Sequence, residues 1–250
     1  MKAAGAERPS PVRIAMWSGP RNLSTAMMRA FGNRPDCAVV DEPFYAAFLR
    51  LSGADHPMRA EILAAQENDW RKVAATLLGP PPGGRALFYQ KHMTHHMLPE
   101  IGRAWMSACR HAFLIRRPER VLASYAAKRE TVGLADIGFV QQEELFDRAA
   151  DLLGEAPAVV DADRILADPA GVLARLCGRL GIAFDERMLA WPAGPRASDG
   201  IWAAHWYDAV NRSTGFAPTA PPPRLEDPAL RAVAVAAMPI YERLSGYAIG

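Results

Sequence analysis

Short apolar runs alternate with amphipathic segments along most of this chain of 250 residues. Five of these runs are followed by polar or turn residues, which is typical of short buried strands. The five runs are Val12–Trp17, Ala38–Asp41, Ala86–His92, His111–Ile115 and Ala158–Val160. Because strands that alternate with helices usually form a parallel sheet with crossover helices, the pattern predicts an α/β fold. We expect three layers, with a central, mainly parallel sheet of about five strands flanked by helices.

Helical periodicity is clearest in five segments, and three of them begin with proline, which suits the first turn of a helix. The segments are Ser24–Phe31, Pro118–Arg129, Glu143–Leu153, Pro169–Leu180 and Pro228–Leu244. Asp168 and Asp227 directly precede two of these prolines and are predicted N-caps. Three stretches rich in Gly and Pro are predicted loops, because periodic segments resume on both sides: Gly79–Gly84, Trp191–Gly200 and Ala217–Pro223. We therefore expect residues 1–250 to form a single domain.

Composition and charge narrow the classes of partner. A formal net charge of +2 gives no broad basic face for nucleic acid, although it allows a local basic pocket for a small polyanion. The three cysteines, Cys37, Cys109 and Cys177, are odd in number and widely spaced, which favours neither a disulfide framework nor a zinc site. The N-terminus lacks an apolar signal core, and the longest apolar run, Ala232–Met238, is far shorter than a membrane span. We expect a cytoplasmic protein that contacts no membrane, and the composition leaves a homodimer open.

Candidate chemistry gathers directly after the predicted strands, where ligands of open parallel sheets bind. After the first strand the chain reads SGPRNLST, Ser18 to Thr25, and enters a helix. Such a turn aims backbone N–H groups outward at the positive end of the helix dipole, which makes it a cradle for phosphate or sulfate. The cradle of nucleoside triphosphatases requires a Gly-Lys pair that is missing here. The predicted ligand is therefore an anion other than an ordinary ATP tail.

Three stretches carry a family resemblance. PRNLSTAM, residues 20–27, resembles the 5′-phosphosulfate loop of sulfotransferases, P-[KR]-S-G-T-T-x-x, although Asn22 and Leu23 replace its Ser and Gly. Arg116 and Ser124, eight residues apart after the fourth strand, are similar to the 3′-phosphate segment of that family. Residues 159–182 resemble its strand, acidic turn and Asp-Pro helix. The order of the three matches makes the resemblance fairly specific over residues 12–182, whereas the loop and helix region 183–250 matches poorly.

The resemblance implies a P-loop-like fold and transfer of a sulfuryl group from the co-substrate 3′-phosphoadenosine 5′-phosphosulfate to a hydroxyl or amine of a small molecule. It places the 5′ phosphosulfate on the first loop, with Arg21 meeting charge on the bridging oxygen, and the 3′ phosphate on Arg116 and Ser124. Arg212 is a further candidate for the 3′ phosphate. The donor-binding loop comprises Gly19, Pro20, Arg21, Asn22, Leu23, Ser24 and Thr25. Two separate anion sites suit a donor with two separate anionic groups, and sulfuryl transfer does not demand a metal clamp.

Two residues compete as the base that takes the acceptor's proton. Glu42 follows the second strand and resembles the carboxylate of carbohydrate-type and bacterial sulfotransferases. His92 follows the third strand and resembles the catalytic histidine of the cytosolic enzymes, with Lys91 beside it as a contact to the bridging oxygen. The cytosolic enzymes read more like K-T-H-L-P at this place, and alignment with that motif also allows His95 or His96 to be the catalytic histidine. The sequence gives Glu42 and His92 equal weight, and His205 joins the two other histidines as a reserve candidate.

Two other functions stay open. Asp41-Glu42 after an apolar strand also resembles a Walker B segment, so a P-loop ATPase or kinase is one alternative, and a non-catalytic nucleotide-binding protein on the same fold is another. The aromatic segment Asp199–Phe216 is predicted to cover the acceptor, to stack on a base, or to pack in the core. We expect acceptor specificity to come from two loops, His56–Gly84 and Trp191–Pro223.

Overall fold

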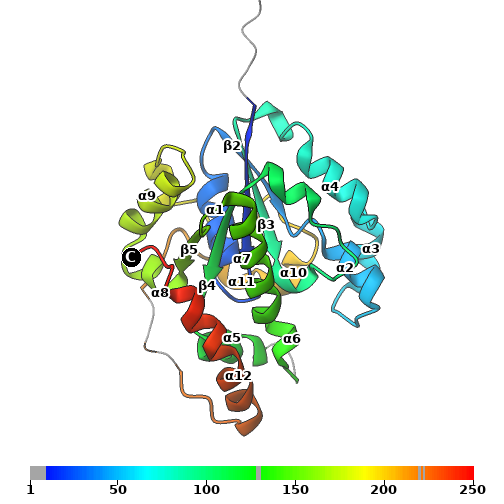
Figure 1. Cartoon of the computed structure of the whole chain (residues 1–250), viewed down its shortest axis with the longest axis vertical. Coiled ribbons are helices and arrows are strands. Elements are labelled where there is room, and N and C mark those ends of the chain that lie inside the picture. Colours follow the sequence, from blue (N-terminus) through cyan, green and yellow to red (C-terminus); the bar gives the residue numbers. More distant parts are fainter. Residues whose placement is uncertain (1–9, 128–130, 219–220, 222) are drawn as a thin grey trace, which may run out of the picture.

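Five parallel strands form one sheet in the order β2-β3-β1-β4-β5 (Figure 1). The computed structural model describes residues 10–127, 131–218, 221 and 223–250. The strands are β1 (Val12–Ser18), β2 (Cys37–Asp41), β3 (Leu87–Met93), β4 (Arg110–Ile115) and β5 (Ala158–Asp161). All five predicted strands are confirmed, each to within a residue at either end. The C-terminal end adds a parallel bridge beside β5, where the Ile249 N–H donates to the Val159 carbonyl at 2.9 Å.

Helices cover both faces of the sheet, so the predicted three layers are confirmed. On one face, Ile14 and Met16 of β1 pack with apolar residues of α1 (Ser24–Gly32), α8 (Ala162–Ala167) and α9 (Pro169–Arg179). On the other face, Ala15 and Trp17 pack with α4 (Trp70–Leu78), α7 (Phe139–Leu153) and α12 (Pro228–Ser245). The alternation along β1 follows from the two-residue period of a strand, which sends successive side chains to opposite faces. In the view of Figure 1, α7 lies in front of the strands and α12 lies below them, over α5 (Pro118–Ala126).

The five predicted helices are present, and two of their caps behave as expected. The side chain of Asp168 accepts from Gly171 N at 2.9 Å at the start of α9, and Asp227 accepts from Ala229 N at 2.8 Å at the start of α12. α5 spans Pro118–Ala126, and α7 begins four residues before the predicted Glu143. The predicted helix Pro118–Arg129 and the predicted loop Ala217–Pro223 both run onto positions outside the described residues, as does the N-terminal segment 1–9.

The prediction that Trp191–Pro223 is a loop is wrong where α10 (Ala203–Trp206) and α11 (Asp208–Asn211) form. The prediction that His56–Gly84 is a loop is also wrong. This stretch contains α3 (Arg59–Ala65), α4 and the 3₁₀ turn η1 (Pro82–Gly84). α4 is short, but it buries Val73, Ala74 and Leu77, and Asp69 caps it by accepting from Arg71 N at 2.9 Å. Burial of that apolar face stabilises a helix that its own length would leave marginal. The other unpredicted elements are α2 (Tyr45–Ser52), η2 (Thr94–His96), η3 (Ala104–Ala108), α6 (Leu134–Ile137), η4 (Glu186–Leu189), α10 (Ala203–Trp206) and α11 (Asp208–Asn211).

Two further observations bear on the sequence analysis. Cys37, Cys109 and Cys177 are all free and buried. Within the described ranges, every helix is too short or too polar to cross a membrane.

Candidate functional site

The loop between β1 and α1 contains two residues in the left-handed backbone region. Arg21 has φ 61° and Leu23 has φ 69°, although neither is a glycine. That conformation costs an L-residue about 1–2 kcal/mol, and Leu23 stands where the motif it resembles has a glycine, which adopts it freely. α1 begins at Ser24 without a side-chain cap. The first N–H groups of the helix are therefore left for a ligand rather than for the chain's own side chains.

The two predicted anion segments meet in space. Arg21 Nε donates to Ser124 Oγ at 2.8 Å, and Arg116 Nη1 donates to the carbonyl of Arg21 at 3.0 Å. Arg116 follows β4 directly and Ser124 lies on α5, while Arg21 follows β1, the neighbour of β4 in the sheet. Burial lowers the pKa of both guanidinium groups from the usual range, which indicates that each would gain from an anionic ligand.

Other loop residues hold this arrangement. The buried Asn22 donates from Nδ2 to the carbonyl of Leu114 in β4 at 3.2 Å, which anchors the loop to the sheet. Gly19 has no room for a side chain, because a Cβ there would clash with the carbonyl oxygen of Ile137. The loop is thus fixed by backbone contacts on both sides.

A cavity of about 330 Å³ lies between these segments and the C-terminal part of the chain. Six predicted donor-site residues line it: Arg21, Leu23, Ser24, Thr25, Arg116 and Ser124. The C-terminal stretch from Trp206 to Pro218 supplies much of the opposite wall, including Ser213 and Phe216. Arg212 is exposed and does not line this cavity, although its neighbour Ser213 does. We call this space the donor cavity.

A second cavity of about 80 Å³ adjoins the donor cavity at the first loop. Arg21, Ser24, Thr25, Trp206 and Tyr207 line both spaces. Residues that line the smaller space but not the donor cavity include Pro20, Glu42, Lys91, His95 and His96, together with the rings of Tyr45, His56, Tyr125 and Trp202. We call it the acceptor cavity. A group held at Arg21, Ser24 and Thr25 would face both cavities at once.

Charged side chains form a buried cluster at one wall of the acceptor cavity. Lys91 Nζ donates to Asp41 Oδ1 at 2.8 Å and to Glu42 Oε1 at 2.7 Å. Tyr207 accepts from Lys91 and donates to Asp41 Oδ2 at 2.7 Å, and Gly200 N donates to the same oxygen at 3.1 Å. Lys91 is only 1% exposed. Burial opposes its charge, yet Asp41 and Glu42 raise the pKa of Lys91 well above its usual range.

Glu42 occupies an unusual backbone position. Its φ of 41° lies in the left-handed region, a conformation that costs about 1–3 kcal/mol and that clusters at functional sites. Backbone bonds from both sides hold it, since Glu42 N donates to the Lys91 carbonyl and the Glu42 carbonyl accepts from Tyr45 N, both at 3.0 Å. Burial raises the pKa of its carboxyl, against the opposing pull of Lys91. Glu42 Oε2 lies 4.0 Å from Nε2 of His96.

The structure does not bring His92 to either cavity. β3 alternates, so Lys91 and Met93 line the acceptor cavity while His92 points to the opposite face of the sheet. Its ring stacks on Trp17 at 4.6 Å and lies 5.1 Å from Trp105, and its Nε2 is 3.3 Å from Gln90 Oε1. Burial lowers the pKa of His92 to about 3, which keeps the ring neutral. His95 and His96 do line the acceptor cavity, whereas His205 lines neither space and packs beside Trp206.

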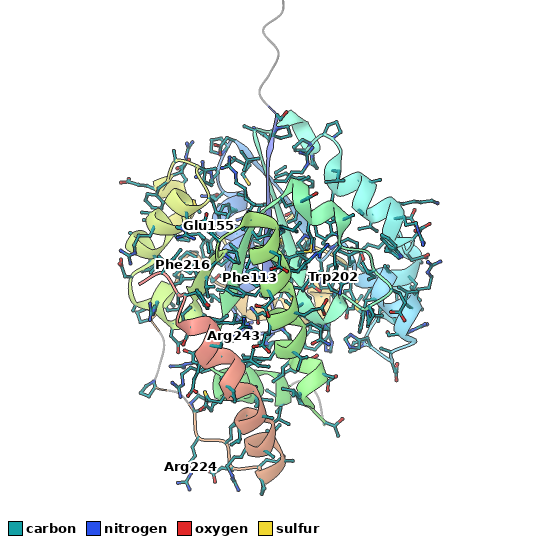
Figure 2. All side chains as sticks on the ribbon, viewed as in Figure 1. Phe113, Glu155, Trp202, Phe216, Arg224 and Arg243 are labelled. Carbon is teal, nitrogen blue, oxygen red and sulfur yellow. The ribbon has the colours of Figure 1, made fainter. Side chains whose placement is uncertain are left out.

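The aromatic segment Asp199–Phe216 is tied to the core and forms a wall of both cavities. The guanidinium of Arg29 makes a buried bidentate ion pair with Asp199 and also donates to Asn211 Oδ1 at 3.1 Å. Trp202 Nε1 donates to Tyr207 Oη at 3.3 Å, beside the charged cluster. In the view of Figure 2, the labelled Trp202 and Phe216 lie on either side of Phe113 in β4. Trp202 lines the acceptor cavity and Phe216 the donor cavity.

Sequence reasoning missed the partners of Lys91. Asp41 and Tyr207 are 166 positions apart, and only the folded sheet brings the phenol to the strand end. The two-residue period of β3 does indicate that the side chains of Lys91 and His92 lie on opposite faces of the sheet. Among the described residues, no group of three or more His, Cys, Asp or Glu side chains is arranged to hold a metal ion.

Comparison with known proteins gives a family match over most of the chain. A family model described as "Sulfotransferase domain" matches residues 12–248, well beyond position 182 at which the motif resemblance ends. Two curated proteins of Arabidopsis thaliana, branched-chain-amino-acid aminotransferase-like proteins 2 and 1, are 37% and 38% identical over 203 and 206 residues. These matches cover 81% and 82% of this chain but only 36% and 37% of the relatives. The chain therefore spans little more than a third of their length, and their names do not transfer to it.

Solved structures give the same fold at low sequence identity. A sulfotransferase from Alicyclobacillus acidocaldarius superposes with a TM-score of 0.55 at 15% identity, covering 95% of each chain. The sulfotransferase domain from the curacin biosynthetic pathway superposes with a TM-score of 0.51 at 15% identity, covering 94% of this chain and 98% of that one. At this identity the likeness concerns the fold, which is the P-loop-like α/β arrangement predicted above.

Proposed function

The chain belongs to the sulfotransferase domain family, and from that premise we propose that it transfers a sulfuryl group from 3′-phosphoadenosine 5′-phosphosulfate to a hydroxyl or amine of a small molecule. One observation carries the proposal: the donor and acceptor cavities adjoin at Arg21, Ser24 and Thr25. A sulfuryl group bound there would be attached to a nucleotide on one side and open to an acceptor on the other. We further propose that residues 1–250 act as a single sulfotransferase domain.

The donor would bind through two anion sites. Backbone N–H groups at the start of α1, with the hydroxyls of Ser24 and Thr25, would hold the 5′ phosphate, and Arg21 would meet the charge that develops on the bridging oxygen. Arg116 and Ser124 would hold the 3′ phosphate. The contact between Arg21 and Ser124 supports this assignment, because it keeps both sites on one cavity wall. The exposed Arg212 has less support than the other donor-site residues.

Glu42 is the base that the geometry favours. Its carboxylate lines the acceptor cavity, with Oε1 held by Lys91 and Oε2 lying 4.0 Å from Nε2 of His96. In the proposed step the acceptor hydroxyl oxygen bonds to sulfur as the bond from sulfur to the phosphate oxygen breaks. The hydroxyl proton passes to Glu42, and 3′,5′-adenosine bisphosphate leaves. Lys91 would act as a positioning residue for Glu42, since its ammonium is bonded to Asp41, Glu42 and Tyr207.

The ATPase or kinase alternative has less support. In a Walker B segment the aspartate would organise magnesium. Here both carboxylate oxygens of Asp41 already accept hydrogen bonds from Tyr207, and Oδ1 also accepts one from Lys91 and Oδ2 one from Gly200 N. The first loop also lacks the Gly-Lys pair that contacts triphosphates. A protein that binds nucleotide without catalysis would keep the donor cavity but would not need Glu42 beside it.

Calorimetry with two ligands tests the proposal. We expect 3′,5′-adenosine bisphosphate to bind and magnesium-ATP to bind far more weakly, because only the bisphosphate matches both anion sites. Transfer of labelled sulfate from the donor to a panel of alcohols and amines then separates an enzyme from a binding protein. Tighter binding of magnesium-ATP than of the bisphosphate would favour the ATPase reading instead.

A further inference from the structure

The charges that line the cavities differ between the donor side and the acceptor side. The charged residues that line the donor cavity are Arg21 and Arg116, and its described lining contains no carboxylate. The acceptor cavity is lined by Glu42, Lys91 and the shared Arg21, and Asp41 pairs with Lys91, so the two carboxylates and the two cations balance when all are ionised. An anionic donor suits the first lining, whereas the second has no excess of positive charge that would attract an anion.

A third cavity, whose described lining is negatively charged, adjoins the acceptor cavity. This outer cavity, of about 290 Å³, shares His56, His95 and Tyr125 with the acceptor cavity. Asp55 and Asp136 line it, and the described part of its lining contains neither lysine nor arginine. Carboxylates therefore occur on both sides of the three shared side chains.

The size of the acceptor cavity limits what reacts there. A water molecule needs roughly 10–15 Å³ of such space, so about 80 Å³ admits on the order of six heavy atoms. Only a small alcohol, or the small end of a longer one, fits beside Glu42.

Rings and one buried polar atom add observations that point to a ligand. Tyr45, Tyr125, Trp202 and Trp206 contribute aromatic surface to this small space, which is suited to a cation. His96 is only 2% exposed, lines the cavity, and has no hydrogen-bond partner for Nδ1 among the described groups. Burial and the neighbouring histidines lower the pKa of His96 well below its usual range, so the neutral ring has a nitrogen that can accept a bond.

We propose that the acceptor is a small alcohol that carries a positively charged nitrogen, and this inference rests on the proposed sulfuryl transfer. Its hydroxyl lies at Glu42, where sulfur is delivered. Its cationic nitrogen lies among the aromatic rings on the side of Asp55 and Asp136. The product is a sulfate ester with no net charge, formed as the hydroxyl proton passes to Glu42 and the adenosine bisphosphate leaves.

Matched acceptors test the proposal with labelled donor. Ethanolamine and choline are compared with neutral analogues in which carbon replaces the nitrogen, and with glycolate, which carries a carboxylate. We expect kcat/KM for each cationic alcohol to exceed that of its neutral analogue by about 10-fold or more, and glycolate to be the poorest acceptor. Added salt should reduce the preference, because it screens the exposed Asp55.

Two substitutions connect the preference to the structure. The double variant Asp55→Asn with Asp136→Asn should reduce the ratio of cationic to neutral turnover several-fold, on the order of 3- to 10-fold, and leave the neutral alcohol unchanged. Asparagine keeps a side-chain oxygen for the Gly133 N–H that Asp136 accepts at 2.8 Å. Asp151→Asn, on the exposed part of α7, is the matched control and should change neither rate.

The outcomes separate this inference from the proposed function. If the adenosine bisphosphate does not bind, both fail. If it binds and neutral alcohols or glycolate react as well as the cationic alcohols, or no cationic alcohol is sulfated, the inference fails and the donor assignment survives. An equal loss for cationic and neutral alcohols in the double variant would also overturn it, since it would show a structural role for the two aspartates.

Discussion

The two cavities that meet at Arg21 are lined in different ways. On the donor side, the start of α1 has no side-chain cap, and Arg21 and Arg116 donate to a hydroxyl and a carbonyl, with Asp163 Oδ1 lying 3.9 Å from Arg116 Nε. On the acceptor side, Lys91 is surrounded by Asp41, Glu42 and Tyr207, which satisfy its charge inside the protein. The donor side is therefore only loosely charge-paired, through the 3.9 Å contact of Arg116 with Asp163, whereas the acceptor side is tightly charge-paired before any ligand arrives.

This difference has consequences for substitutions. Buried charges that pair with one another contribute to the fold as well as to chemistry, because removing one leaves the others unpaired. Charged side chains that are fully paired only when a ligand is bound contribute more to ligand affinity than to the stability of the fold. The same kind of substitution should therefore change stability on the acceptor side and affinity on the donor side.

The largest expected effect is on the rate of transfer by Glu42→Gln. Glutamine retains the shape of the side chain but cannot take a proton, so turnover should fall by about 10²–10⁴-fold. Affinity for adenosine bisphosphate, measured by calorimetry, should stay the same because Glu42 does not line the donor cavity. Glu100→Gln, at an exposed position, is the control. Full turnover by the Glu42 variant on a confirmed acceptor would remove the carboxylate as the base and leave His96 and His95 to be tested.

Lys91→Met should produce the largest loss of stability. It leaves the buried carboxylates of Asp41 and Glu42 without their cation, and breaking a buried ion pair in this way costs about 3–5 kcal/mol of unfolding free energy. Urea unfolding measures the loss. Adding Asp41→Asn should restore part of it, since one of the unpaired charges is then gone.

A matched control for this variant is Lys72→Met, because the side chain of Lys72 is 69% exposed and lies 3.7 Å from Glu67 at the surface. Such a substitution should change stability by less than about 0.5 kcal/mol. Equal losses from the two lysines would contradict the idea that the acceptor side is held together by its own charges.

Arg116→Ala should weaken binding on the donor side by a smaller factor. A hydrogen bond to a charged group contributes about 1.5–3 kcal/mol, so affinity for 3′,5′-adenosine bisphosphate should fall by roughly 10- to 100-fold. Adenosine 5′-phosphosulfate lacks the 3′ phosphate, and its affinity should hardly change. Arg224→Ala serves as the control, with an expected change of no more than about twofold because that side chain is 88% exposed. Equal weakening of both nucleotides would make Arg116 a structural residue.

The sequence predicted the strands and the donor side better than the acceptor side, for physical reasons. Strands and the loop after β1 are encoded locally, by apolar runs and by a short motif that ends at the start of a helix. Tyr207 reaches Asp41 through a bend of the C-terminal segment that no local pattern encodes, and α4 depends on the burial of Val73 and Leu77 against the sheet. The sequence motifs predict catalytic roles for both Lys91 and His92, although strand alternation places the two side chains on opposite faces of the sheet.

The smallest expected effect on transfer belongs to His92→Phe, and it sharpens the contrast between the two faces of β3. Phenylalanine keeps a planar ring beside Trp17 and Trp105, so transfer should stay within about threefold of the unmodified protein, whereas a catalytic role would cost about 10²-fold or more.

Acid unfolding gives the second readout for His92→Phe. Burial lowers the pKa of His92 in the folded state from 6.5 to about 3, so between these values the unfolded chain binds a proton that the folded chain does not. The stability that His92 contributes is therefore complete above pH 6.5 and is lost as the pH falls toward 3. Removing the imidazole should make the unfolding free energy fall less steeply across that range, with a residual slope from His111, whose pKa burial lowers to about 4. An unchanged slope together with a large loss of turnover would return His92 to the site.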